Sequence, residues 1–205
     1  QPADQPDITR PKLRFVRACR LSAAPLAEKE KAVQTYSWEG ADRDTPEQFL
    51  AFSKAYLRAA RVICRDLIEN PDEHTYENGC ACMFNARLSV ELFLKATLFK
   101  ANSSTQLSHD IDALFAQFKA AYVGDAYAWH PPFIVEVLGA SSESEQLDRM
   151  KTHKKEYKQD QALRYPRSRD MQLWQHVVAF SATEFQNELN QLASDVARLE
   201  SEIFS

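Results

Sequence analysis

An apolar segment in the middle of the chain carries three charged residues at a spacing of four. Arg87, Glu91 and Lys95 would lie along one face of an α-helix, where they can form ion pairs in series. Apolar side chains cover most of the remaining circumference, and a helix that is apolar on so many sides is central in its domain. Because an unpaired buried charge is very costly, the pattern predicts either a structural ladder of ion pairs or the floor of a functional site.

Hydrophobic spacing predicts long helices with short connections over most of the chain. We expect Thr45 to cap the first helix and Pro71 to stop it, and Ser108 to cap the third. An all-α, up-and-down bundle of four to five helices is therefore predicted for 45–205, with 1–44 as an irregular N-terminal tail or arm. The expected helices cover about 45–70, 80–101, 108–122 and 171–204.

Composition narrows the fold class and the partners. The 205 residues suit one domain, or one domain with an appendage. With 4 glycines, the chain fits poorly to a β-rich fold or to phosphate-binding glycine loops. The formal charge of −4 gives no overall attraction to nucleic acid, so such binding needs a local patch. No apolar run is long enough to cross a bilayer, so no membrane association is expected.

The cysteines follow neither a metal-binding nor a redox spacing. Cys80 and Cys82 are separated by one residue, which is not the spacing of a zinc knuckle or a redox pair. We expect them to be small buried hydrophobic residues, with no metal and no cofactor. Since the pattern does not suggest a disulfide scaffold, a reducing cytoplasm is the expected compartment. The first residue is Gln rather than Met, which leaves a longer parent chain open.

Three segments, in this order, resemble the HEPN superfamily. They are ARLSVELFLKATLFK at 86–100, SHDIDALF at 108–115 and LRYPRSRD at 163–170, which leads into the long last helix. The resemblance covers about 45–204. It implies a helical bundle that often pairs with a second copy, and RNA or nucleotides as ligands. Many members are metal-independent ribonucleases of toxin–antitoxin or phage-defence systems, whereas others lack the catalytic residues and serve as binding or assembly modules.

The catalytic pattern of that family is an arginine, a polar residue next to it, and a histidine after four to six intervening residues. Arg169, Asp170 and His176 match its outer limit, so the resemblance implies Arg169 and His176 as the catalytic pair. A spacing of seven would place them on one face if the segment were continuously helical. Histidine suits proton transfer and arginine suits phosphate binding. The structural alternative is a capping arginine and a half-buried core histidine.

Further basic residues near this pair are candidates for RNA contacts. Arg164 and Arg167 lie close enough in sequence to add phosphate contacts. A lysine-rich segment, in which Lys151, Lys154 and Lys155 stand out, is a candidate for holding the RNA backbone. The structural alternative for this segment is a solvated charged surface.

The remaining candidate residues belong to the central helix and to the start of the next one. Arg87, Glu91, Lys95 and His109 are candidates for lining the cleft, or for a second layer behind it. The structural alternative is an ion-pair ladder, with His109 as a helix-start residue bonded to backbone or to a nearby acid.

Two hypotheses on function follow. One is an RNA-directed domain that cleaves RNA without metal through Arg169 and His176. The other is a non-catalytic module that binds a nucleotide, RNA or a protein partner, or forms a homodimer. A structural accessory domain of a larger system is a third interpretation. The expected partners are RNA or a nucleotide, a second copy of the chain, and an antitoxin protein.

Overall fold

Four long helices form a bundle in the part of the chain that the structure describes. This computed structural model describes residues 43–102, 108–134, 159–173 and 180–205, all within one compact unit, Glu39–Ser205. In these ranges there is no β-strand beyond an isolated bridge between Arg167 and Leu173. The predicted all-α bundle is confirmed, while 1–42 of the predicted arm lie outside the described residues. The elements are α1 (Thr45–Glu69), η1 (Pro71–Glu73), α2 (Tyr76–Ala101), α3 (Ile111–Ala121), η2 (Asp125–Tyr127), α5 (Gln159–Ala162) and α6 (Ala182–Phe204).

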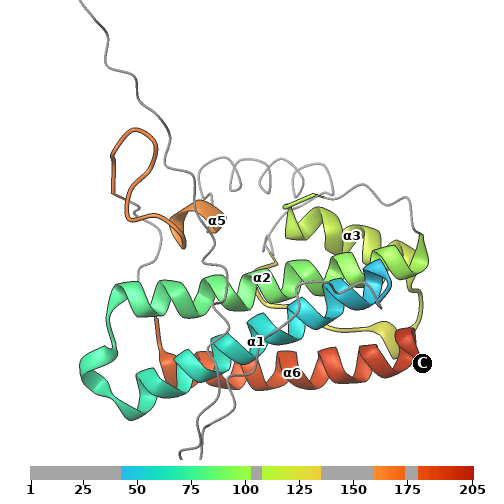
Figure 1. Cartoon of the computed structure of the whole chain (residues 1–205), viewed down its shortest axis with the longest axis horizontal. Helices are drawn as coiled ribbons and strands as arrows, with labels where there is room; N and C mark the ends of the chain where they lie inside the picture. The colour runs from blue at the N-terminus through green and yellow to red at the C-terminus, as the bar shows by residue number, and fades with distance from the viewer. Residues whose placement is uncertain (1–42, 103–107, 135–158, 174–179) are drawn as a thin grey trace, which may run out of the picture. The chain divides into compact units, whose positions relative to one another are not determined.

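Helices α1 and α2 form an antiparallel hairpin, and α6 lies beside it (Figure 1). Helix α1 has one apolar face, along which Leu50, Leu57 and Cys64 are buried at intervals of seven. Its N-cap is Asp44, whose side chain accepts a hydrogen bond from the amide of Glu47 at 3.0 Å. The prediction of Thr45 as the cap was therefore wrong by one residue, because the preceding carboxylate takes that position.

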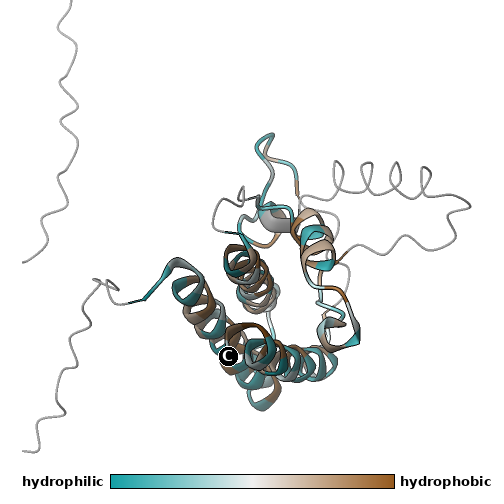
Figure 2. Cartoon of the chain, turned by 90° about the vertical axis from the view of Figure 1, so that its right-hand side faces the viewer, coloured by the Kyte–Doolittle hydropathy of each residue, from teal (hydrophilic) through white to brown (hydrophobic). Residues whose placement is uncertain are grey.

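Helix α2 is the central helix of the bundle. It contacts α1, α3 and α6, and it is buried on several sides, since Val90, Lys95 and Ala96 point in different directions around the helix axis and are all buried. It begins four residues before the predicted start, because Thr75 caps it by accepting from the amide of Asn78. Charged residues interrupt its apolar surface, and none of the described helices could span a membrane. In the end-on view of Figure 2, hydrophobic residues turn toward neighbouring helices and hydrophilic residues lie outside.

Helix α3 covers the C-terminal part of α2. Asp110, rather than the predicted Ser108, caps it by accepting from the amides of Asp112 and Ala113. Ser108 accepts from the amide of Asp110 and so supports the cap from one position further out. An aromatic cluster seals α3 against the core: Trp129 lies edge-on to Phe93, Phe115 and Phe118.

Helix α6 begins eleven residues later than the sequence pattern predicted. Ser181 caps it at Ala182, whereas Met171 lies in a turn with a φ of 60°, outside the range of a right-handed helix. The amide of Ser168 donates to the carbonyl of Gln172 at 2.9 Å, which closes the turn. Residues 174–179 lie outside the described ranges, so the predicted helix over 171–204 is confirmed only from Ala182 onward.

The cysteines that the structure describes are buried and free. Cys64 lies in α1, and Cys80 and Cys82 lie near the start of α2, where burial raises the pKa of each thiol. The Sγ of Cys82 donates to the carbonyl of Ala60 at 3.3 Å. The prediction that Cys80 and Cys82 are small buried residues is therefore confirmed.

Candidate functional site

A buried charged ladder crosses the centre of the bundle on α2. Lys95 Nζ donates to Glu91 Oε1 at 2.6 Å, and Arg87 Nη1 lies 3.5 Å from Glu91 Oε2. All three residues are buried, so the predicted series of ion pairs is present. One carboxylate is shared by two cations, and the ladder therefore carries one positive charge in excess.

His109 connects this ladder to the surface. Its Nδ1 lies 2.9 Å from Glu91 Oε1, and its side chain is 86 % exposed whereas that of Glu91 is 4 % exposed. Its backbone carbonyl accepts from Arg87 Nη2 at 3.2 Å. The expectation that His109 bonds to a nearby acid is confirmed, and the charged residues of α2 hold both its ring and its backbone.

A second feature is a basic turn after α5, which we call the arginine turn (residues 164–173). It surrounds a surface pocket of about 570 Å³. Arg164, Tyr165, Arg167 and Arg169 are exposed there, and no acidic side chain is among the described residues that line the pocket. The lining residues are Gln161, Arg164, Tyr165, Pro166, Arg167, Ser168, Arg169 and Met171.

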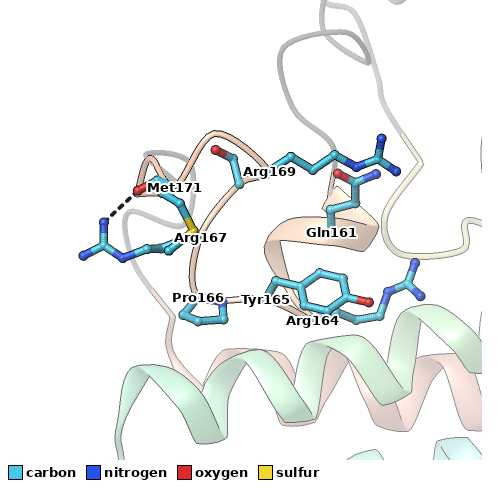
Figure 3. A pocket seen from close by; sticks show the side chains of 8 residues that line it. Gln161, Arg164, Tyr165, Pro166, Arg167, Arg169 and Met171 are labelled. Atoms are coloured by element: carbon cyan, nitrogen blue, oxygen red, sulfur yellow. Dashed lines mark hydrogen bonds between the residues drawn. The ribbon is translucent and has the colours of Figure 1, made fainter. Parts of the chain in front are cut away.

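The arginines of this turn differ in direction (Figure 3). Arg164 and Arg169 extend to the side on which Gln161 lies, whereas Arg167 points the other way. Arg167 Nη1 donates to the carbonyl of Met171 at 2.8 Å, which ties it to the turn itself. Arg164 lies over the ring of Tyr165, with 5.9 Å from its Cζ to the ring centroid. Arg164 and Arg169 are therefore the guanidinium groups best placed to meet a ligand in the pocket.

One strip of α2 connects the arginine turn and His109. Arg164 Cζ also lies 5.6 Å from the ring centroid of Phe84, and His109 contacts Glu91 seven residues further along the same helix. Seven residues are close to two turns, so both positions lie on the same face, about 10 Å apart along the axis. Figure 1 shows α5 and α3 on that same side of α2.

Of the predicted catalytic pair, the structure describes Arg169 but not His176. Arg169 is exposed in the arginine turn, and His176 lies outside the described residues. The segment from Arg169 to Leu173 is a turn with a bridge, so the condition of a continuous helix from Arg169 to His176 is not met. Arg164 and Arg167 line the same pocket as Arg169.

The structure does not describe every predicted site residue, and it adds residues that were not predicted. Lys151, Lys154 and Lys155 fall outside the described residues. Two aromatic residues were not predicted from the sequence: Tyr165, which lines the pocket, and Phe84, whose ring lies under Arg164. The available signal was the composition of the LRYPRSRD segment, which places an aromatic ring beside three arginines within a proline turn.

Neither a metal-binding cluster in the described ranges nor a similar protein points to a particular chemistry here. In the described ranges, no group of three His, Cys, Asp or Glu residues could hold a metal ion. Comparisons with protein-family models, curated proteins and solved structures find no match for this chain. The described side chains offer an arginine pocket with an exposed aromatic ring, and an exposed imidazole held by a buried carboxylate.

Proposed function

We propose that this chain binds single-stranded RNA through the pocket of the arginine turn. The observation that carries the proposal is the joint lining of this pocket by Arg164, Arg169 and the exposed ring of Tyr165. A guanidinium group can hold two phosphate oxygens at once, and an aromatic ring offers a surface on which a base can stack. The turn thus supplies the local basic patch that a chain with a net charge of −4 needs.

Size and shape favour a nucleotide over inorganic phosphate as the bound unit. A pocket of about 570 Å³ falls in the range that usually holds small organic ligands. Tyr165 and Met171 are 55 % and 67 % exposed, so they offer apolar contact to a base that is not paired. This favours a single strand over a duplex, whose bases are stacked inside the helix. The resemblance to HEPN domains supports the same class of ligand.

RNA cleavage by Arg169 and His176 stays a prediction, as do the toxin or defence setting, the homodimer and an antitoxin partner. The binding proposal does not depend on cleavage, and it includes the alternative of a non-catalytic module. A comparison of RNA binding with RNA cleavage distinguishes a catalytic domain from a non-catalytic module. Binding without any cleavage in EDTA indicates a module, whereas cleavage that His176→Ala abolishes indicates the family's catalytic pair.

Replacing both Arg164 and Arg169 by alanine is expected to weaken RNA binding by about tenfold or more at about 0.1 M salt. The reason is the loss of two phosphate contacts, which also lowers the dependence of affinity on salt, by about 0.7 in slope for each contact. Fluorescence anisotropy with a labelled single-stranded RNA measures both quantities.

A double variant with the same change of charge provides the control. Arg58 and Arg65 are exposed on α1 and lie outside the pocket lining, so Arg58→Ala with Arg65→Ala should leave affinity within about twofold of the wild type. An equal loss of affinity in the two double variants would show that only net charge matters. Absence of RNA binding by the wild type would end the proposal.

A further inference from the structure

An exposed histidine is held in place by buried charges. The ring of His109 is tied through Nδ1 to Glu91 Oε1 at 2.9 Å, and its carbonyl accepts from Arg87 Nη2 at 3.2 Å. Glu91 is itself fixed by Lys95 Nζ at 2.6 Å. An exposed side chain is ordinarily free to move between rotamers, whereas this ring has a defined position on the surface.

These contacts also determine what the ring can do. When Nδ1 donates its proton to Glu91, Nε2 is an acceptor. Because the side chain is 86 % exposed, Nε2 is open to a ligand at the surface. The same Glu91 oxygen also accepts from Lys95 Nζ at 2.6 Å, so the carboxylate has a fixed position and orients the ring with Nε2 outward. The pair of Glu91 and His109 therefore has the arrangement of a general base, with Glu91 as its positioning residue.

The strip of α2 places this base near the proposed RNA site. Arg164 lies over Phe84, and His109 contacts Glu91 about 10 Å further along the same face. An oligonucleotide held in the arginine turn and lying along this face passes the imidazole. We infer that His109 is the residue that accepts the proton of a ribose 2′-hydroxyl during metal-independent cleavage of bound RNA, an inference that rests on the proposed function.

The step is balanced without a cofactor. His109 Nε2 takes the 2′-hydroxyl proton, and the 2′ oxygen forms a bond to the adjacent phosphorus while the bond from phosphorus to the 5′ oxygen breaks. The leaving 5′ oxygen takes a proton from water, and the hydroxide so formed takes the proton from the imidazolium. The products are a 2′,3′-cyclic phosphate and a 5′-hydroxyl, with no net consumption of water and no change of oxidation state.

The test compares cleavage and binding of the full chain in EDTA. The substrate is a single-stranded RNA with a fluorescent label, and the control substrate is the same sequence as DNA, which lacks the 2′-hydroxyl. His109→Ala is expected to lower the single-turnover rate by about 100-fold or more, while RNA affinity stays within about twofold. Because the side chain is exposed, the variant is expected to fold, and circular dichroism with urea unfolding checks this.

Each outcome decides between the proposals. The inference is supported if wild-type protein leaves a 2′,3′-cyclic phosphate on RNA, spares DNA, and loses activity with His109→Ala but not with the control His74→Ala, which replaces an exposed histidine outside the pocket lining. It is overturned if the wild type binds RNA without cleaving it, or if His109→Ala cleaves at the wild-type rate, and RNA binding as a function survives both results. If the wild type binds no RNA at all, the proposed function fails as well.

Discussion

Replacing Glu91 by glutamine is expected to lower the free energy of unfolding by about 3–5 kcal/mol. Glutamine keeps the shape of the side chain but removes the anion that Lys95 and Arg87 share. Two buried cations would then lie close to one another without a counterion, and His109 would lose its charged partner. Urea unfolding followed by circular dichroism should show a lower midpoint with an unchanged m-value.

The matched control is an ion pair at the surface. Lys54 Nζ lies 2.8 Å from Glu200, with side chains 52 % and 32 % exposed. Because solvent screens such a pair, Glu200→Gln is expected to cost less than about 1 kcal/mol. Equal effects of the two substitutions would mean that the ladder on α2 is as well hydrated as the surface pair, and would contradict its description as a buried cluster.

Replacing Phe93 by alanine is the second large effect, expected to cost about 3–5 kcal/mol. Phe93 is fully buried on α2 and packs edge-on against Trp129, with ring centroids 5.4 Å apart. Its removal leaves a cavity between α2 and the aromatic cluster under α3, which closely packed neighbours can fill only in part. Thermal and urea unfolding both measure this loss.

An exposed phenylalanine of the same bundle is the control, because it distinguishes the loss of core packing from the loss of a phenylalanine as such. Phe52 lies on α1 and is 53 % exposed, so Phe52→Ala is expected to change the free energy of unfolding by about 0.5 kcal/mol or less. A loss for Phe93→Ala as small as this would show that α2 is not the centre of the core.

The central helix was predictable from the sequence because two independent patterns, the apolar residues and the charges at a spacing of four, both indicate it. Apolar residues surround α2, and the spacing of four between Arg87, Glu91 and Lys95 is one at which ion pairs form along a helix. The helix ends were less predictable, because several neighbouring residues are able to cap. Asp44 and Asp110 are caps where Thr45 and Ser108 were expected, since a carboxylate one or two residues away competes for the same amides.

The site could be predicted in part. The basic composition of the LRYPRSRD segment indicates a phosphate-binding patch, and Arg164, Arg167 and Arg169 do line one pocket. The hydrophobic spacing of the last helix extends back to Met171 and predicted a helix from that residue. Met171 instead lies in a turn with a positive φ, which hydrogen bonds between Ser168 and its near neighbours close. The pairing of His109 with Glu91 joins residues 18 apart, and it depends on how α3 packs on α2, which spacing alone does not encode.

Photo-crosslinking with a single-stranded RNA that carries 4-thiouridine tests the location of the binding site most directly. We expect mass spectrometry to find the crosslinked peptides in 161–171, with Tyr165 as an acceptor beside Arg164 and Arg169. Prior addition of unlabelled RNA should abolish them. Crosslinks confined to the exposed faces of α1 or α6 would contradict RNA binding at the arginine turn.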